Sequence, residues 1–260
     1  MPLSWKVKPT DVERVRNVVA RGVKSNTFVQ NRIRRNVTGP APPFRRGDFW
    51  EVVVGCLLTT RQRSGPGSQV GKFLSLNPSP LSLDACQSSD VESLAKRAFT
   101  DFGGIRFVPT IAVRLSANLV WLSERGWGLV KSEYDSLLSQ RLANPEPAHA
   151  ATERRSARFI QKNLQGFGPK QSRNLWQWLG VTRYEIPIDM RVTKWLNDNL
   201  SANIESKYLG NTAYYESVED FIQALSNEAG VVPCVLDAAM FASGFREWEA
   251  DELSRVESNN

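Results

Sequence analysis

Apolar residues recur every three or four positions along most of the chain, which is the spacing of an amphipathic α-helix. In residues 11–24, for example, valines share one face, and Thr10 or Asp11 can cap the first turn. No segment alternates apolar and polar residues as a strand would, and no internal repeat is visible. The pattern predicts helices over residues 11–24, 91–102, 109–125, 154–164, 169–179, 189–200, 218–225 and 232–243. The predicted fold class is therefore all-α.

The segment 49–62 is ambiguous because it opens with an almost continuous apolar run that is rich in valine. Such a run suits a buried strand or a buried helix. Asp48 precedes it as a possible cap, and the run continues into Thr-Thr-Arg-Gln, so a buried helix is favoured. Glycine and proline interrupt the chain at residues 39–43, where we expect a turn or a linker, and at residues 64–68, where we expect a flexible loop.

The composition narrows the classes of function. No run of 18 apolar residues occurs and the first ten residues lack the apolar core of an export signal, so we expect a cytoplasmic protein without a membrane partner. Three cysteines cannot hold a four-cysteine iron–sulfur cluster, and none of them has metal-ligand spacing. His149 is the only histidine, which disfavours zinc and Ser-His-Asp chemistry. We therefore expect no metal and no cofactor.

Positive charge is concentrated in two blocks of a chain whose net charge is +6. Residues 1–46 carry eleven basic and two acidic residues, and residues 150–195 carry nine basic and three acidic ones. The tail after Met240 is acidic instead, with Glu247, Glu249, Asp251, Glu252 and Glu257. Solvated basic faces are one explanation, but two separate blocks favour a polyanionic partner such as DNA.

The segment 163–176 reads Asn-Leu-Gln-Gly-Phe-Gly-Pro-Lys-Gln-Ser-Arg-Asn-Leu-Trp and predicts a tight turn between two helices. Gly166 and Gly168 permit backbone conformations and close approaches that a side chain would block. Pro169 suits the first turn of a helix, whose free N–H groups and positive dipole end can hold a phosphate. A plain corner between two helices is the alternative interpretation.

Lys170 stands at the start of the second helix, where an acidic residue would be ordinary. Positive charge from Lys162 and Arg173 is expected to lower the pKa of Lys170, and a nucleophilic amine needs a lowered pKa. Nineteen residues later, Asp189 follows the apolar Ile186-Pro-Ile188 at a predicted helix start. Asp189 is either a simple helix cap or the partner of Lys170 in catalysis.

The segment 164–195 resembles the helix-hairpin-helix DNA glycosylase superfamily, whose signature is this hairpin followed by a Gly/Pro-rich loop and an aspartate. Lysine at position 170 is typical of the bifunctional branch, and the missing cluster cysteines argue against the endonuclease III type. The chain resembles most the compact type 2 8-oxoguanine DNA glycosylases, whose pattern recurs in residues 49–62, 104–109 and 235–241. The resemblance covers roughly residues 12–245.

This resemblance implies two helical subdomains with a DNA-binding cleft between them. Residues 47–180 would form a helical barrel that ends in the hairpin, and residues 1–46 with 181–260 would form the second subdomain. The expected protein is a monomer, associated with the nucleoid, that binds double-stranded DNA containing a modified base. Lys170 would attack C1′ of the flipped nucleotide, and Asp189 would stabilise charge on the sugar. The resulting Schiff base would permit strand nicking, which is AP lyase activity.

The resemblance also assigns binding residues. The expected DNA contacts are Lys162, Gln165, Gly166, Gly168, Arg173, Arg191, Arg61 and Gln62, the last two beside the base opposite the flipped one. Asn174 and Asp237 would line the base pocket, since a buried acid must be paired or bind something.

The substrate stays open, because the acidic tail and the segments 39–43 and 64–68 depart from the type 2 pattern. An 8-oxoguanine-type base, excised in DNA repair, is the substrate that the resemblance implies. The alternative substrate is a bulky modified pyrimidine, such as the glucosylated hydroxymethylcytosine of phage DNA. An enzyme that excises such a base would be an antiviral factor. A monofunctional glycosylase and a non-catalytic hairpin protein that only binds DNA are further alternatives.

Overall fold

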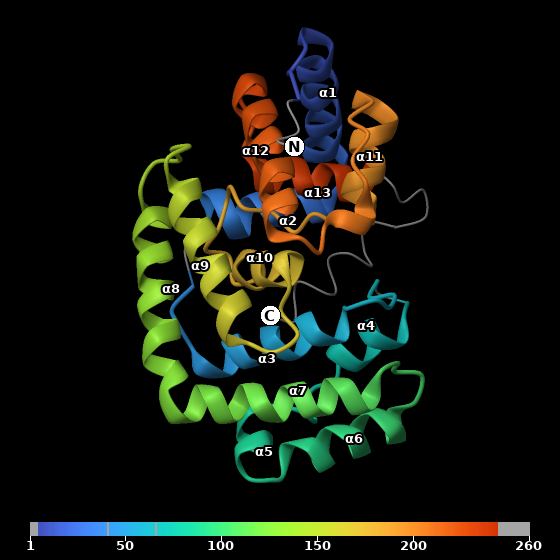
Figure 1. Ribbon diagram of the computed structural model, residues 1–260, viewed down its shortest axis with the longest axis vertical. Coiled ribbons are helices and arrows are strands. Elements are labelled where there is room, and N and C mark those ends of the chain that lie inside the picture. Colours follow the sequence, from blue (N-terminus) through green and yellow to red (C-terminus); the bar gives the residue numbers. More distant parts are fainter. Residues whose placement is uncertain (1–4, 41, 66, 244–260) are drawn as a thin grey trace.

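The computed structural model describes residues 5–40, 42–65 and 67–243, and within these ranges it is helical with no strand (Figure 1). The acidic tail lies outside the described residues, as do Ala41 and Pro66 in the two Gly/Pro segments. No helix in the described ranges has the length and apolar character needed to cross a membrane. The prediction of an all-α fold is confirmed for this part of the chain.

The helices follow one another through short connections. In chain order they are α1 (Pro9–Ser25), α2 (Thr27–Ile33), η1 (Arg34–Thr38), α3 (Arg46–Leu58), α4 (Gln69–Leu74), α5 (Leu83–Gln87), α6 (Val91–Phe102), α7 (Val108–Trp121), η2 (Leu122–Gly126), α8 (Trp127–Leu142), α9 (His149–Asn163), α10 (Pro169–Trp178), α11 (Met190–Leu200), η3 (Ser206–Tyr208), α12 (Thr212–Ala229) and α13 (Pro233–Ser243).

The ambiguous apolar run forms helix α3, so the preference for a buried helix over a strand is confirmed. Every residue from Val52 to Leu58 is buried, which explains why the run shows no amphipathic period. The helix begins at Arg46, so the prediction that Asp48 caps it is wrong. Asp48 lies within the first turn instead, where its charge complements the helix dipole.

Helix α8 was not predicted, because the glycines at 126–128 were expected to end the preceding helix. The chain instead continues from α7 through the π-helical turn η2 into α8. Gly126 has ordinary right-handed helical angles, and a Cβ atom there would lie 2.5 Å from the ring of Trp121. This glycine therefore makes room for a tryptophan rather than stopping a helix. The short helices α2, α4 and α5 were also missed, since five to seven residues are too few to show a period.

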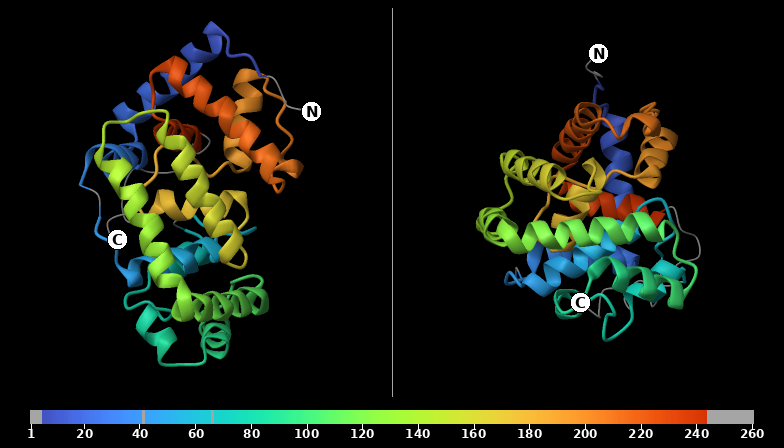
Figure 2. Two further views of the ribbon diagram at one scale, coloured as in Figure 1. Left: turned by 60° about the vertical axis from the view of Figure 1, so that its left-hand side comes forward. Right: turned by 60° about the horizontal axis from the view of Figure 1, so that its bottom comes forward.

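Buried apolar side chains form two clusters. The first draws on residues between Phe49 and Val181, and the second draws on Val15–Val29 and Ile186–Met240. Figures 1 and 2 show α1, α11, α12 and α13 grouped at one end of the molecule and α4 to α7 at the other. Both ends of the described chain therefore contribute to one cluster, and α9 and α10 lie between the two groups of helices.

The packing of Gly126 against Trp121 predicts that Gly126→Ala lowers the free energy of unfolding by about 1–3 kcal/mol, because the added methyl overpacks the contact. Gly128→Ala is the matched control, since it lies two residues on in α8 and a Cβ there meets nothing within 4 Å. That change should instead stabilise the protein by up to about 1 kcal/mol through helix propensity. Denaturant unfolding of both variants tests the contrast, and equal effects would contradict it.

Candidate functional site at the helical hairpin

Helices α9 and α10 form the predicted hairpin, and residues of α3 and α7 contact its turn. Gly166 has φ +86°, and a Cβ there would lie 2.6 Å from Leu57 and 2.8 Å from Arg114. The Asn118 side chain accepts a hydrogen bond from the N–H of Gln165 at 2.7 Å and donates one to its carbonyl at 3.1 Å. Glycine is thus required at position 166 by both conformation and contact.

Gly168 differs from Gly166, and the expectation that its neighbours exclude a side chain is wrong. Its φ is −86°, and a Cβ there would meet nothing within 4 Å. The folded protein therefore does not itself demand glycine at this position, which caps α10. The open side of Gly168 leaves its backbone accessible to an external group.

The turn borders a shallow cavity of about 490 Å³, lined by Arg114 and residues 161–168. Lys162 and Gln165, two predicted DNA contacts, lie on its rim with exposed side chains. Arg114 comes from α7, far away in the sequence, and was not predicted. Its guanidinium and the Lys162 ammonium make the lining of the cavity cationic.

Lys170 occupies the first turn of α10 with a partly buried side chain. Its amine has no hydrogen-bond or ion-pair partner within the described ranges. Burial lowers the pKa of Lys170, and the charge of Arg191 lowers it further, while Asp189, Cys56 and Asp237 act in the opposite direction. The direction agrees with the sequence analysis, but the cause does not, because Lys162 and Arg173 are not the groups responsible.

Asp189 caps helix α11. Its Oδ1 accepts hydrogen bonds from the N–H groups of Arg191 at 2.8 Å and Val192 at 3.1 Å, and its Oδ2 accepts one from Arg191 Nε at 2.8 Å. Burial opposes ionisation, but the hydrogen bond and charge of Arg191, together with the charge of Lys170, hold the pKa of Asp189 below its usual value. Asp189 is therefore an anionic cap whose charge acts on Lys170.

Asp237 is buried on α13 and is paired with Arg32, whose Nη1 lies 2.9 Å from Asp237 Oδ2. Burial raises the pKa of Asp237, the charge of Arg32 lowers it, and the charge of Asp189 raises it. The acid has the partner that its burial requires. Arg32 belongs to the N-terminal basic block, and the sequence offered no signal that it points inward.

Asn174 lies one helical turn after Lys170 and is half-buried. Its amide donates to Cys56 Sγ at 3.5 Å and to the Gln171 carbonyl oxygen Oε1 at 3.3 Å. Burial raises the pKa of Cys56 to about 12, so this thiol is neutral beside Lys170. Around the amine the structure thus brings together Asn174 and Cys56 with the charges of Asp189, Asp237 and Arg191.

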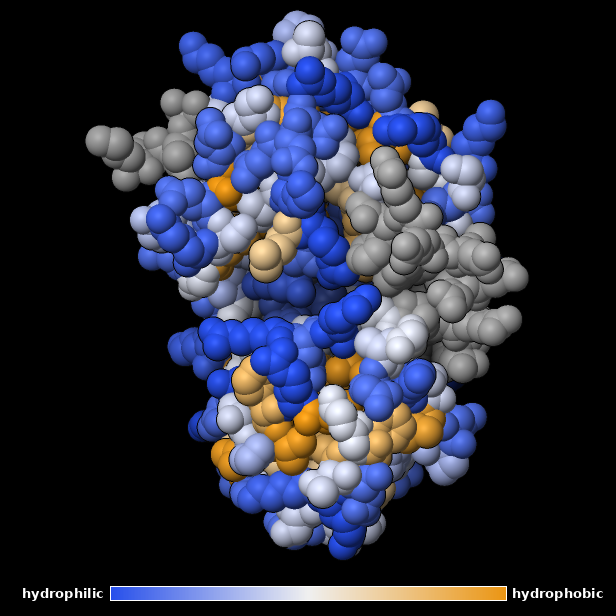
Figure 3. All heavy atoms as spheres, turned by 90° about the vertical axis from the view of Figure 1, so that its right-hand side faces the viewer, coloured by the Kyte–Doolittle hydropathy of each residue, from blue (hydrophilic) through white to orange (hydrophobic). Residues whose placement is uncertain are grey.

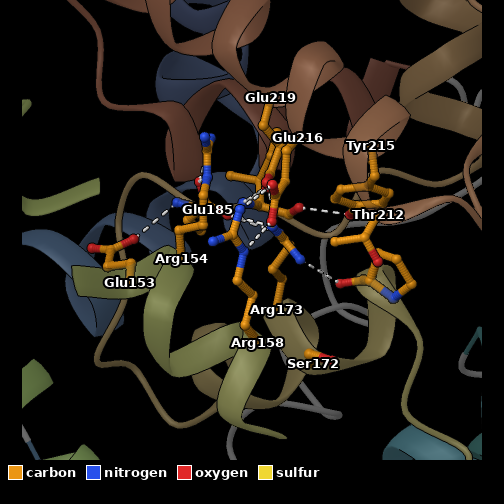
Figure 4. A network of polar contacts seen from close by, with 12 residues as sticks. Glu153, Arg154, Arg158, Ser172, Arg173, Glu185, Thr212, Tyr215, Glu216 and Glu219 are labelled. Atoms are coloured by element: carbon orange, nitrogen blue, oxygen red, sulfur yellow. Dashed lines mark hydrogen bonds and ion pairs between the residues drawn. The ribbon is translucent and has the colours of Figure 1, made fainter. Parts of the chain in front are cut away.

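Arg173 was predicted to contact DNA, and the structure contradicts this. Its side chain is fully buried, with Nε 2.9 Å from Glu185 Oε2 and 2.7 Å from Glu219 Oε2 (Figure 4). The turn of the helix directs position 173 inward, where its guanidinium lies between the buried carboxyl groups of Glu185, in the segment before α11, and Glu219 on α12. Burial and the charge of Glu185 raise the pKa of Glu219 well above its usual value.

The same region holds further ion pairs, which sequence reasoning missed (Figure 4). Arg154 on α9 pairs with Glu185 at 2.8 Å and with Asp220 at 2.7 Å. The buried carboxylate of Glu153 accepts hydrogen bonds from the backbone N–H groups of residues 183–185, and burial raises its pKa to about 7. This network joins the hairpin helices to α12 and to the segment that leads into Asp189.

Arg61 and Gln62 have different surroundings. Gln62 is engaged within the protein, donating to the Leu58 carbonyl at 2.7 Å and accepting from the Arg106 N–H at 3.0 Å. Arg61 is exposed and has φ +57°, and Phe107, which is 43% exposed, has φ +60°. Positive φ is uncommon outside glycine and often marks binding sites. Gln62 thus supports a surface on which Arg61 and Phe107 are presented.

The face shown in Figure 3 is hollowed at mid-height, and hydrophilic residues line the hollow. Apolar residues gather on the half of this face below it. Within the described ranges, no three histidine, cysteine, aspartate or glutamate side chains come together in a way that could hold a metal ion.

The burial of Arg173 predicts that Arg173→Leu destabilises the protein by about 3–5 kcal/mol, because Glu185 and Glu219 lose their shared cation. Lys162→Leu, which removes an exposed charge from the neighbouring helix, should change stability by less than about 0.5 kcal/mol. Denaturant unfolding at pH 7 measures both. A marginal effect of Arg173→Leu would contradict the structural role.

The lowered pKa of Lys170 predicts a stability effect that needs no substrate. The folded protein binds protons at Lys170 less readily than the unfolded chain, so Lys170 costs stability at neutral pH, and this cost disappears as the pH rises toward the unfolded-state pKa. Lys170→Met should therefore raise the free energy of unfolding at pH 7, by about 1–3 kcal/mol as for an unpaired buried polar group. The gain should shrink on going to pH 10, and Lys162→Met should show neither effect.

No family model, no curated protein and no solved structure matches this chain.

Proposed function

We propose that the protein is a DNA glycosylase with AP lyase activity, which flips a modified base out of double-stranded DNA and cleaves its glycosidic bond. One observation carries the proposal. The Lys170 amine is partly buried, has a lowered pKa and no partner in the described ranges, and lies in the electrostatic field of the Asp189 carboxylate. The resemblance of residues 164–195 to helix-hairpin-helix glycosylases supports the same conclusion.

The protonation states suit nucleophilic attack. Only the neutral amine of a lysine attacks carbon, and burial favours this form of Lys170. Asp189 has a lowered pKa and is anionic at neutral pH. A fixed anion beside the reacting sugar stabilises the positive charge that develops as the base departs. The two groups therefore supply the nucleophile and the electrostatic stabilisation that glycosidic cleavage needs.

The proposed reaction has two stages. The Lys170 nitrogen forms a bond to C1′ as the glycosidic bond breaks, and the base leaves with the bonding electron pair and takes up a proton. The nitrogen then loses a proton to solvent, and the sugar ring opens to a Schiff base. Loss of a C2′ proton and departure of the 3′ phosphate complete β-elimination, which nicks the strand.

Two surfaces support DNA binding. At the hairpin, the open backbone at Gly168 lies next to Lys162 and Arg114, which suits a phosphate of the DNA backbone. At a second place, Arg61 and Phe107 are exposed in strained conformations. An exposed arginine and an aromatic ring are suited to contact and stack on the base left opposite the flipped nucleotide.

The flipped base would lie against Asn174 and near Asp237, since both stand on the Lys170 side of their helices. Asp237 with Arg32 offers an acceptor and a donor to the edge of a base. We propose an 8-oxoguanine-type base as the first substrate to test, with bulky modified pyrimidines of phage DNA as the second.

The proposal predicts a covalent adduct when the protein and a duplex containing an abasic site are treated with borohydride, because hydride reduces the Schiff base. Lys170→Ala should abolish the adduct. In a base-release assay, Asp189→Asn should slow cleavage of the glycosidic bond by about 10²–10³-fold, because positive charge develops on the sugar as the base departs. Lys162→Ala is the control, and should weaken DNA binding, most strongly at low salt, while the adduct still forms at saturating DNA. An adduct that persists in Lys170→Ala would contradict the assignment of the nucleophile.

The substrate is tested by base release from a panel of duplexes and phage genomes that carry different modified bases. Release without any trapped adduct would instead favour a monofunctional glycosylase. DNA binding with neither release nor adduct would favour a non-catalytic role.

A further inference from the structure

An amine and a carboxylate that share a partly buried site ordinarily form an ion pair. Such a pair raises the pKa of the amine and keeps it protonated, which would prevent Lys170 from acting as a nucleophile. Within the described ranges, Asp189 and Lys170 share no hydrogen bond or ion pair. The structure must therefore contain something else that satisfies the carboxylate.

The acceptor positions of Asp189 are filled from its own helix. Oδ1 accepts the N–H groups of Arg191 and Val192, at 2.8 and 3.1 Å, and Oδ2 accepts Arg191 Nε at 2.8 Å and also Arg191 Nη2. An ionised carboxylate offers about four lone-pair sites, so four donors leave little capacity for Lys170. The Arg191 side chain thus forms a two-pronged contact with Asp189.

An aromatic ring holds the guanidinium of Arg191 from another helix. The guanidinium carbon lies 4.0 Å from the centroid of the Phe241 ring, and Phe241 stacks on Phe28 at 5.0 Å between centroids. A planar, permanently charged group suits a position between a carboxylate and a ring face, and a lysine does not reproduce both contacts.

We propose that Arg191 is a positioning residue: it occupies the Asp189 carboxylate and thereby keeps the Lys170 amine out of an ion pair. The use of that amine as a nucleophile rests on the proposed function, but the state of the amine is measurable without substrate. DNA contact by Arg191, as predicted from the sequence, is compatible with this role because its side chain is 37% exposed.

The other groups that face Lys170 fit the same arrangement. Asp237 on α13 is paired with its own arginine, Arg32, at 2.9 Å. Cys56 on α3 is neutral, since burial raises its pKa to about 12. Each carboxylate whose charge acts on Lys170 therefore has an arginine of its own, and the charge of Arg191 also lowers the pKa of Lys170 directly.

The first test is free of substrate. Reductive methylation with ¹³C-formaldehyde labels the lysines, NMR follows the pH titration of each, and Lys170→Arg identifies the Lys170 signal. In Arg191→Gln the midpoint of the Lys170 titration should move to higher pH, because the Asp189 carboxylate, released from Arg191, pairs with the Lys170 amine. Arg191→Lys keeps the positive charge but cannot form the two-pronged contact with Asp189, and it should shift the Lys170 midpoint by a smaller amount.

Lys194→Gln is the matched control, because it removes a positive charge from the same helix. Lys194 is exposed and pairs with Asp198 at 2.6 Å, so its loss should leave the Lys170 midpoint unchanged. An unshifted midpoint in both Arg191 variants would overturn the proposal. The proposal would also be overturned if Lys170 of the wild-type protein titrated together with the exposed lysines. This measurement does not depend on the folding of any variant.

The second test is the pH profile of borohydride trapping in single turnover at saturating DNA with an abasic site. Arg191→Gln should trap at least about tenfold more slowly at pH 7 and recover toward the wild-type rate at higher pH, since one unit of pKa changes the neutral fraction tenfold. A uniform loss at every pH would mean that Arg191 acts only in structure or DNA binding and would overturn the proposal. Absence of any adduct in the wild type would overturn the proposed function instead. The NMR titration would still decide whether Arg191 keeps Lys170 out of an ion pair.

Discussion

Arg173 forms the buried contact on which the arrangement of the molecule depends. Two glutamates, Glu185 and Glu219, share its fully buried guanidinium, and these three residues come from α10, α12 and the segment before α11. A buried charge without its partner costs several kcal/mol, so these elements have few alternative positions. Because Lys170 precedes Arg173 on α10 and Asp189 follows Glu185, the same contact fixes the amine and the carboxylate relative to each other.

Each of the two carboxylates near Lys170 is paired with an arginine, and neither forms an ion pair with the Lys170 amine. Arg191 holds Asp189, and Arg32 holds Asp237. Burial then lowers the pKa of Lys170, whose amine has no hydrogen-bonding partner in the described ranges. A site of this kind lowers the free energy of unfolding, because a methionine at the position of the lysine would make the folded protein more stable. Such a loss of stability is typical of functional sites.

The fold was predictable where helices are long and amphipathic, as in α1, α6 and α11, because their buried faces leave a period in the sequence. Prediction failed at α8, where Gly126 signals a helix end although it serves to accommodate Trp121. At the candidate site, the hairpin, Lys170 and Asp189 were recognisable because turn residues and helix starts are local signals. Arg173 was assigned to the surface, since nothing local distinguishes a buried arginine from an exposed one.

By itself, the sequence determined the helical class, the hairpin turn at Gly166, and the positions of Lys170 and Asp189 at helix starts, because these depend on neighbours within a few residues. Only the tertiary structure decided which arginines are buried, which carboxylate each one pairs with, and that Arg114 and Phe107 join the predicted surfaces. Pairing of charges depends on groups up to about two hundred residues apart, such as Arg32 and Asp237, and their low-dielectric surroundings exist only once the two clusters have packed.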